Sequence, residues 1–290
     1  MRYSLWPFIT VAIAAAVLYG SRIFKERVQR VVLPLATAAI FLAAWQFGCD
    51  LKKYELRDSA TGTVRLLEVF PTPWQTCVEL GRMSGDGTLL RYTVASLYRV
   101  AIGFGLAALI GIPVGLWMGW STRTFRALNP MVQALRPISP IAWIPIAILW
   151  FGVEDASAIF LIFVASIFPI MTGAYTAVHS IPSVYVRSAR NFGLRRHEVF
   201  RYVVFPASLP QIITSLRFAL GIAWMVIVAA EMIAVQSGLG YVITDARNGN
   251  NYARVCGAMF CLGVLGIVLD FGMRQLQKLD EVRWGFSKVS

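Results

Sequence analysis

Few side chains in this sequence of 290 residues are suited to chemistry, and they are scattered. The two histidines, His179 and His197, lie near one basic segment, while Glu231 and Asp270 interrupt long apolar runs. The sequence contains no HExxH pair, no GxSxG elbow and no Gly-Lys-Ser/Thr phosphate loop. A proton relay would also need more acids inside the apolar runs. We therefore expect no catalytic centre, no bound cofactor and no metal site.

The elements that carry these side chains are predicted to be membrane helices. Hydrophobic residues make up 57% of the chain and charged residues only 14%, whereas about a quarter of a soluble chain is charged. A helix of about 20 apolar residues crosses a bilayer. Six stretches approach or exceed that length, and they are the expected core spans: 31–48, 100–120, 137–153, 156–178, 212–235 and 255–273. We predict an all-α polytopic membrane protein with a six-helix core and an extra N-terminal hydrophobic helix at 5–20, which either spans the membrane or lies in its plane.

The positive charge is distributed in step with these spans. Most of the net charge of +12 lies in four basic segments: 21–30, 121–136, 187–201 and 274–290. Cytoplasmic loops of membrane proteins are the ones enriched in Lys and Arg. The pattern predicts that all four segments, and the carboxyl terminus, face the cytoplasm, and it argues against nucleic acid as a partner. Cleavage of a signal peptide before residue 21 would invert this orientation, so we expect none.

The same orientation places the two membrane acids and two of the cysteines. Glu231 lies 19 residues along 212–235, roughly 28 Å from the inner end of that span and near its outer interface. Asp270 falls near the inner end of the last span. Either acid is a packing or gating anchor or a transport ligand. Cys49 and Cys77 share the large outer loop, where they either form a disulfide or remain thiols.

The densest basic segment, 187–201, holds five arginines and one acid. Between Ser183 and Val204 the only helix breaker is Gly193, which predicts two short helices joined there. Pro206 and Pro210 are expected to end this element before the next span begins. The segment is either an interfacial helix whose arginines bind anionic lipid headgroups, or a helix pair that inserts into a groove on a cytoplasmic partner.

The residues of this segment resemble a known family. The run Ala189-Arg190-Asn191-Phe192-Gly193, followed by Phe200, Val204, Pro206 and Leu209-Pro210, is similar to the "EAA" loop of the permeases of ABC importers. Arg136-Pro137, Trp143-Ile144-Pro145, Trp150-Phe151-Gly152 and Ser237-Gly238-Leu239-Gly240-Tyr241 are similar to the branch that imports sulfonate, taurine, nitrate and bicarbonate. The resemblance covers about residues 64–285.

The resemblance implies a permease subunit in the bacterial cytoplasmic membrane, not an enzyme. Two permease copies would form a central path, two cytoplasmic ATPase subunits would bind ATP, and a periplasmic binding protein would deliver a small anionic solute. The implied parts are an N-terminal helix with a basic segment (1–30), a first span with a large periplasmic loop (31–92), a permease core (93–280) with a coupling loop (179–211), and a cytoplasmic tail (281–290).

The resemblance also implies roles for particular residues of the coupling loop. Gly193 would allow close approach of the ATPase, and Phe200 would fill an apolar pocket on it. The family usually has Glu-Ala where this chain has Arg187-Ser188, so the ion pair implied for that glutamate is reversed or replaced. The full set of implied coupling residues is Arg187, Ser188, Ala189, Gly193, Arg195, Arg196, Phe200, Pro206 and Pro210.

The third predicted span contains Pro137, Pro140 and Pro145, and irregular backbone at membrane depth either faces water or is buried in protein. We expect this region either to line the path, with Trp143, Pro145, Trp150 and Glu231 as path residues, or to form a packing kink. Arg217 is the only basic residue within the six spans, which predicts a weakly selective path and leaves specificity to the binding protein. In the preceding span, Gly111 and Gly115 predict close helix packing.

Three other classes of protein are weighed against the permease. A secondary carrier would show inverted repeats and polar groups at the midplane, and the sequence shows neither. A membrane enzyme acting on lipids would need a cluster of His, Asp or Glu at an interface, and these residues are too sparse. A structural membrane subunit stays open, because only association with an ATPase separates it from a permease. The two permease copies are either identical or different chains.

Overall fold

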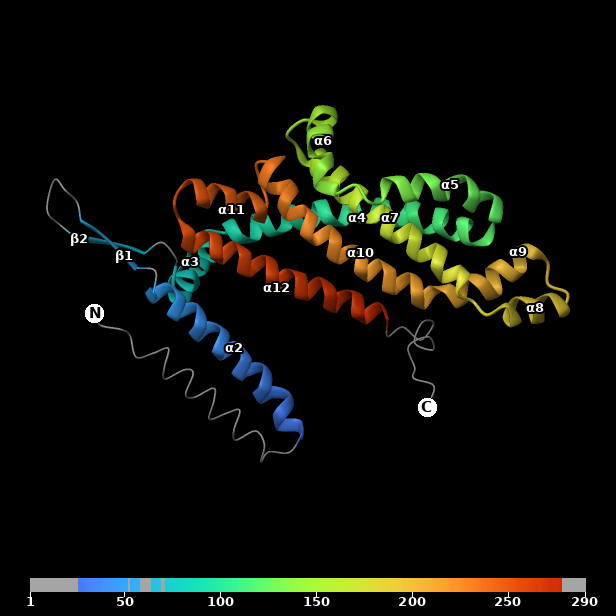
Figure 1. Ribbon diagram of the computed structural model, residues 1–290, viewed down its shortest axis with the longest axis horizontal. Coiled ribbons are helices and arrows are strands. Elements are labelled where there is room, and N and C mark those ends of the chain that lie inside the picture. The colour runs from blue at the N-terminus through green and yellow to red at the C-terminus, as the bar shows by residue number, and fades with distance from the viewer. Residues whose placement is uncertain (1–25, 52, 58–63, 69–70, 278–290) are drawn as a thin grey trace. The chain divides into compact units, whose positions relative to one another are not determined.

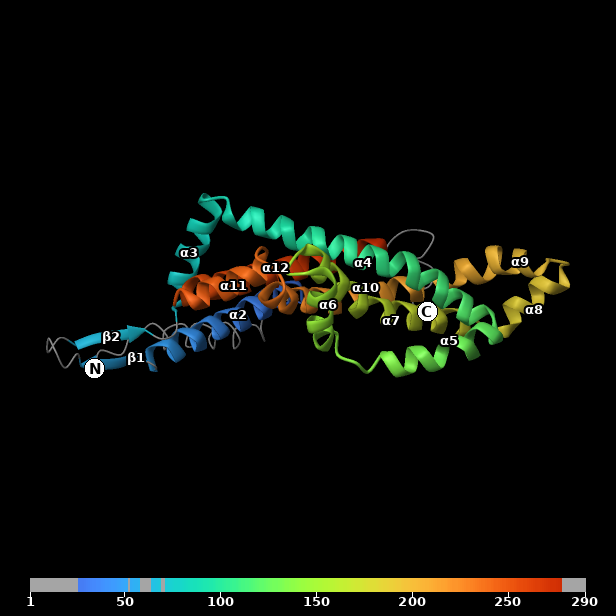
Figure 2. The ribbon, with the colours of Figure 1, turned by 90° about the horizontal axis from the view of Figure 1, so that it is seen from above.

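The computed structural model describes residues 26–51, 53–57, 64–68 and 71–277 (Figures 1 and 2). The predicted N-terminal helix at 5–20 and the tail 281–290 lie outside this part. The chain divides into two compact units, residues 1–86 with 246–257, and residues 87–245 with 258–290. Each unit is described by itself.

The first unit contains helix α2 (Glu26–Leu51), strands β1 (Lys53–Arg57) and β2 (Val64–Glu68), and helix α3 (Pro73–Gly85). The strands pair antiparallel, with Lys53 opposite Glu68. This hairpin was not predicted, and it lies in the stretch expected to form the large outer loop. Helix α3 begins with a capping box between Thr72 and Gln75.

No disulfide joins Cys49 to Cys77. Cys77 is exposed on α3, and the Cys49 thiol is buried and donates a hydrogen bond to the carbonyl of Pro71, 3.3 Å away. Trp45 donates to the same carbonyl through its indole nitrogen at 3.1 Å. The carboxyl-terminal part of α2 is thereby attached to the chain just before α3.

The second unit is built on long apolar helices: α4 (Thr88–Trp120), α7 (Asp155–His179), α10 (Phe205–Ile233) and the part of α12 (Tyr252–Leu276) that follows Gly257. Each of these helices is long and apolar enough to cross a bilayer. Helix α7 lies between α4 and α10, and the core is formed where these three meet, around Leu161, Ile162 and Ile227. This helical membrane architecture confirms the predicted fold class.

The glycines of α4 allow this packing, as predicted. A Cβ at Gly111 would lie 3.0 Å from the side chain of Ile170, and one at Gly115 would overlap the carbonyl oxygen of Met171. A Cβ at Gly103, about two turns before Gly111, would likewise overlap the side chain of Ile162. The small residues therefore bring the backbones of α4 and α7 close together.

The predicted third span, 137–153, is not a continuous membrane helix. Helix α5 (Thr122–Leu135) is followed by a short 3₁₀ helix (Pro140–Trp143) and α6 (Ile144–Phe151), and the chain bends by 86° between α5 and this second part. Pro137 and Pro140 explain the break, because proline removes a helical hydrogen bond and disfavours helical backbone in the preceding residue. The described residues thus hold four straight candidate spans and one broken one; the apolar part of α2, Leu35–Cys49, is shorter.

A second correction concerns Pro206 and Pro210, which do not end an element. Helix α9 (Arg196–Val199), a π-helical turn (Phe200–Val204) and α10 follow one another as one helix from Arg196 to Ile233. Pro206 has no N–H to donate to the preceding turn of this continuous helix, and the wider π turn directly before it accommodates the missing hydrogen bond. Pro210 lies inside α10 and is buried.

Candidate functional site

The segment 183–204, here called the basic turn, lies at one end of the second unit (Figure 1). Helix α8 (Ser183–Asn191) is followed, two residues after its last residue, by Gly193, whose φ of +83° favours glycine. The amide of Gly193 donates to the carbonyl of Arg190, and that of Leu194 donates to the carbonyl of Ala189. These two bonds form a Schellman motif. The predicted joint at Gly193 and the short helix before it are confirmed, but the helix after Gly193 is not short, because it continues into α10.

The basic turn has an apolar inner side. Ala189, Val199 and Val204 are buried in one cluster with residues of α4 and α7. The ring of Phe200 packs against Trp120 of α4, with 5.5 Å between ring centroids. Phe200, which was expected to reach into a partner, is therefore directed into its own chain.

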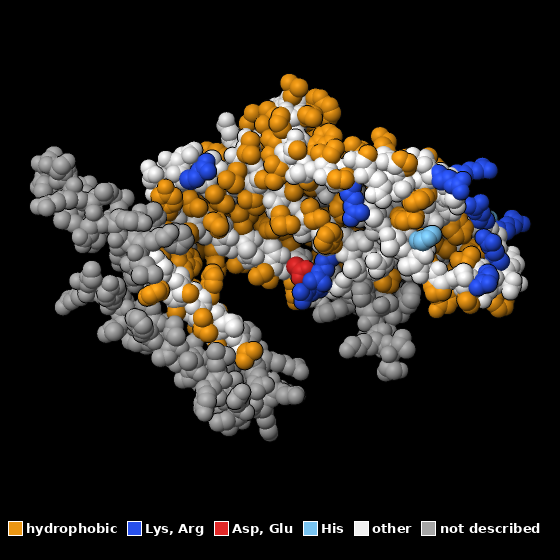
Figure 3. All heavy atoms as spheres, in the orientation of Figure 1, with side chains coloured by type: hydrophobic (Ala, Val, Ile, Leu, Met, Phe, Trp, Pro, Cys, Tyr) orange, Lys and Arg blue, Asp and Glu red, His pale blue; other side chains and the backbone are white. Residues whose placement is uncertain are grey.

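The outer side of the basic turn carries positive charge and aromatic surface. Phe192, at the end of α8, is 85% exposed, and Val184 and Tyr185 in the first turn of α8 are also exposed. In Figure 3, basic side chains gather at this end, while hydrophobic side chains cover much of the remaining helical surface and only a few other basic groups are in view. The exposed polar residues of the implied coupling set are Arg187, Ser188, Arg195 and Arg196.

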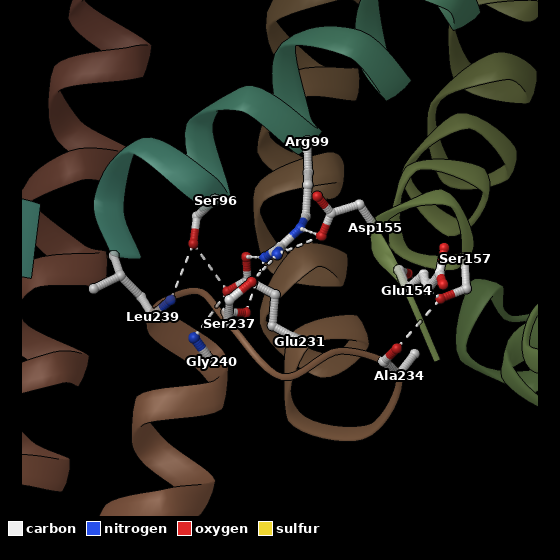
Figure 4. Close-up of polar contacts among 10 residues, drawn as sticks. All are labelled: Ser96, Arg99, Glu154, Asp155, Ser157, Glu231, Ala234, Ser237, Leu239 and Gly240. Carbon is white, nitrogen blue, oxygen red and sulfur yellow. Dashed lines mark hydrogen bonds and ion pairs between the residues drawn. The ribbon is translucent and has the colours of Figure 1, made fainter. Parts of the chain in front are cut away.

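A polar cluster that is largely buried, with Asp155 exposed, is here called the Arg99 network and lies where α7 begins and α10 ends (Figure 4). It consists of Ser96, Arg99, Asp155, Glu231, Ser237, Leu239 and Gly240. Arg99 is 1% exposed and Glu231 is fully buried. The Arg99 Nη1 atom lies 2.6 Å from Glu231 Oε1, and Arg99 Nη2 lies 2.7 Å from Asp155 Oδ1. One guanidinium thus joins α4, α7 and α10.

Glu231 is satisfied on both oxygens. Its Oε2 atom accepts hydrogen bonds from the Ser96 hydroxyl and from the amide of Gly240, each at 2.9 Å. Arg99 also donates to the carbonyl of Ser237 at 2.9 Å and to its hydroxyl. Gly238 has a φ of +102°, and a Cβ there would overlap the Glu231 carboxylate. The loop 237–240 must therefore contain glycine to close over the ion pair.

The expected path residues do not form one site. Glu231 is enclosed in the Arg99 network, so no path can reach its carboxylate in this conformation. Trp150 is exposed and Trp143 is half-buried; both rings pack against Phe160 of α7, at 5.8 and 6.4 Å between centroids. Pro145 is exposed on α6. Trp143, Trp150 and Phe160 form an aromatic cluster at the broken span.

The sequence did not predict Arg99 as a site residue. A charged residue at the edge of an uncharged run was the available signal, but its partners are 56 and 132 positions away. Asp270 has the simpler role of an anchor. Its two oxygens accept from Arg217 of α10, and Arg274 donates to Oδ2 at 2.9 Å.

Taken together, the long apolar helices and the broken span define an all-α polytopic membrane protein. The fold resembles that of a chain of the MetNI methionine ABC transporter in an inward-facing conformation. The TM-score is 0.57 at 18% identity, and the match covers 63% of this chain and 92% of that chain.

The chain belongs to the family described as the inner membrane component of binding-protein-dependent transport systems, whose model matches residues 111–281. It is 32% identical to the taurine transport system permease protein TauC of Escherichia coli, over 86% of this chain and 89% of that protein. It is 34% identical to the bicarbonate transport system permease protein CmpB of Synechococcus elongatus, over 89% and 92%. The nitrate import permease protein NrtB of Leptolyngbya laminosa is 36% identical, over 87% and 88%.

These matches confirm the resemblance drawn from the basic turn and the tryptophan-rich segment. The chain is a permease subunit of an ABC importer and a transport component, not an enzyme. Membership of this family implies that the chain functions together with ATPase subunits and a binding protein. The secondary carrier and the lipid enzyme are thereby set aside.

Proposed function

We propose that two copies of this chain form the membrane path of an importer for a small anion, which a periplasmic binding protein delivers and two cytoplasmic ATPases drive. The relatives are named for taurine, bicarbonate and nitrate, and each of these solutes carries an anionic group. ATP binds to the partner subunits, and this chain needs no cofactor of its own. The observation that carries the proposal is the basic turn, folded as a rigid hairpin with its apolar side inward and its aromatic and basic side outward.

The ATPase contacts the exposed side of the basic turn. Phe192 offers the apolar anchor that was first expected from Phe200, and Arg187, Arg195 and Arg196 surround it with positive charge. Arg187 donates to Ser183 of its own helix at 3.0 Å, so its guanidinium is held at the surface. An acidic rim around an apolar groove is the complementary surface on the ATPase.

In this assignment the basic turn and the carboxyl terminus face the cytoplasm, and the Arg99 network lies toward the outside. The positive charge of the turn supports this orientation. Helix α7 runs from Asp155, in the network, to His179, next to the turn, a rise of about 36 Å, enough to cross the hydrocarbon core.

The orientation predicts which side of the membrane reaches an engineered thiol. Arg195→Cys, in a variant without the four native cysteines, should react with a membrane-impermeant maleimide in inside-out vesicles and not in intact cells. Arg195 is exposed at the tip of the turn, so reagent on the correct side meets no barrier. Labelling of intact cells would overturn both the orientation and the ATPase contact.

The permease is expected to respond to the loaded binding protein and not to solute alone. In proteoliposomes with permease and ATPases, free nitrate, taurine or bicarbonate should leave ATP hydrolysis near its basal rate, and addition of the loaded binding protein should raise it several-fold. The comparison is made with the same binding protein without solute. Strong stimulation by solute in the absence of binding protein would contradict the proposed division of labour.

A further inference from the structure

A hollow of about 600 Å³ lies in the second unit between α7 and α10, beside the link from α5 to the 3₁₀ helix. Its wall differs from the apolar surface expected of helices in lipid. Six lining residues are polar, one of them charged: Arg136, Thr172, Thr176, Gln211, Thr214 and Ser215. Gly173 lets the two helices approach here, because a Cβ at this position would overlap the Ser215 hydroxyl.

The hollow has a polar half and an apolar half. Thr172 and Thr176 lie in the last turns of α7, and Gln211 and Thr214 in the first turns of α10, so the polar half is next to the basic turn. Further from the turn the wall is formed by apolar side chains, among them Val164, Phe168, Phe218 and Ile222. Helices α7 and α10 run in opposite directions. The end of α7 and the start of α10 therefore lie at the same end of the hollow and both contribute to its polar half.

The hydroxyls of the polar half form hydrogen bonds within their own helices. Each one donates its proton to a carbonyl one turn earlier in its own helix: Thr172 to Phe168 at 2.8 Å, Thr176 to Thr172 at 2.8 Å, Thr214 to Pro210 at 3.0 Å and Ser215 to Gln211 at 2.9 Å. Their oxygens therefore keep lone pairs for outside donors. Such a wall holds water well but gives an anion no strong donor.

Arg136 supplies the strong hydrogen-bond donor that the hydroxyls lack, and it lies further from the basic turn than the sequence predicted. The sequence grouped it with a cytoplasmic basic segment, but α5 turns back along α7. Phe125 stacks on Tyr175 at 4.7 Å, and Val132 packs with Met171 and Phe168. Arg136 follows one turn later and lines the hollow together with Phe168. Phe168 lies about 20 Å from the start of α7 and about 16 Å from its end, so Arg136 is near mid-depth.

The side chains of Arg136 and Gln211 have no hydrogen-bond or ion-pair partner in the part of the chain that the structure describes. Among the residues that the structure describes, no carboxylate pairs with the Arg136 guanidinium and no group bonds the Gln211 side-chain amide. Five arginine–carboxylate contacts are present elsewhere, made by Arg82, Arg99, Arg217 and Arg274. An arginine at membrane depth faces a water-filled cavity or a partner, because an unpaired charge in lipid is costly. The hollow provides that water.

We propose that Arg136, assisted by the Gln211 amide, is a transient anion site in the translocation path, and that the hydroxyl-lined half of the hollow is its water-filled exit toward the ATPases. Phe168 and Phe218 form the apolar barrier on the other side. A single guanidinium with hydrated walls binds an anion weakly, as transit requires. The proposal rests on the proposed import function and names the solute-facing surface, replacing the path set that includes Glu231.

The test uses thiol reagents of opposite charge and needs no knowledge of the solute. Thr214→Cys is placed in the assembled transporter without native cysteines, in inside-out vesicles. Its reaction rates with methanethiosulfonate ethylsulfonate, an anion, and with the ethyltrimethylammonium analogue, a cation, give a ratio that reports the local charge. Arg136→Gln should lower the anion-to-cation ratio about fivefold or more, because one nearby charge acts on both reagents with opposite sign.

Matched variants keep this result specific. Arg136→Lys should retain the ratio, and Arg126→Gln, which removes an exposed charge from the same helix away from the hollow, should leave it unchanged. Phe271→Cys, exposed on α12 close to Asp270, should react slowly with both reagents. An unchanged ratio in Arg136→Gln, or a Thr214→Cys thiol as unreactive as Phe271→Cys, would overturn the site.

Failure of the import function would look different. Wild-type transporter in the same vesicles should hydrolyse ATP faster when the loaded binding protein is added. If that stimulation is present and the charge ratio is insensitive to Arg136, the path site alone is wrong. If wild-type vesicles show no stimulation while the thiol still reports Arg136, the hollow is charged but the proposed function fails.

Discussion

Arg99→Leu is expected to destabilise the permease by about 3–5 kcal/mol, the usual cost of removing one partner of a buried ion pair. The substitution leaves the Glu231 carboxylate fully buried, with Ser96 and Gly240 as its remaining donors. It also removes the ion pair between Arg99 and Asp155, so the side chain that joins α4, α7 and α10 is lost. Thermal unfolding of the purified protein in detergent should show a fall in Tm of about 10 °C.

Two further variants separate the buried charge from lost packing. Arg99→Leu combined with Glu231→Leu should recover much of the Tm, since replacing both partners leaves no uncompensated charge. Arg217→Leu removes an arginine whose ion pair with Asp270 is partly exposed, and it should lower the Tm far less. A double variant as unstable as Arg99→Leu alone would show that the ion pair is not the source of the loss.

Phe192→Ala is expected to weaken binding of the ATPase subunit about 30-fold or more. A large aromatic side chain at the centre of an interface commonly contributes 2 kcal/mol or more (about a 30-fold change in Kd), and Phe192 is the most exposed large side chain of the basic turn. Titration of labelled ATPase onto the permease in nanodiscs measures the Kd. The Tm of the permease alone should not change, because Phe192 buries little of its surface within the chain.

Phe200→Ala is the matched control for this experiment. Phe200 packs on Trp120 inside the chain, so its truncation should lower the Tm and leave the Kd for the ATPase within a few-fold of wild type. The opposite result, a weakened Kd for Phe200→Ala and none for Phe192→Ala, would restore Phe200 as the docking residue and remove the assignment made from exposure.

The sequence predicted what depends on local chemistry. The apolar runs indicated the long helices, and Gly193 indicated the joint of the basic turn, because only glycine adopts a positive φ there at little cost. Gly111 and Gly115 indicated a close helix contact. In each case the residue type alone restricts the backbone or the packing.

What depends on distant partners was not predictable. Whether Phe192 or Phe200 faces outward is decided by where α4 places Trp120. The prolines at 137 and 140 signalled an irregular span, but the direction of the break is set by the packing of Val132 against α7. Because of that direction, Arg136 lies beside the middle turns of α7, whereas the sequence assigned it to a cytoplasmic segment. Arg99 required contacts with two residues far along the chain, and no local pattern contains them.

The helix from Arg196 to Ile233 continues through the π turn at 200–204 and so connects the basic turn directly to the Arg99 network. It is about 55 Å long, so a tilt of about 10° at the basic turn displaces its far end by about 10 Å. The far end carries Glu231, whose bonds with Arg99 and Gly240 hold over only a few ångströms. A displacement of that size would separate Arg99 from Glu231, so in the proposed import cycle the Arg99–Glu231 contact would oppose movement of the helix.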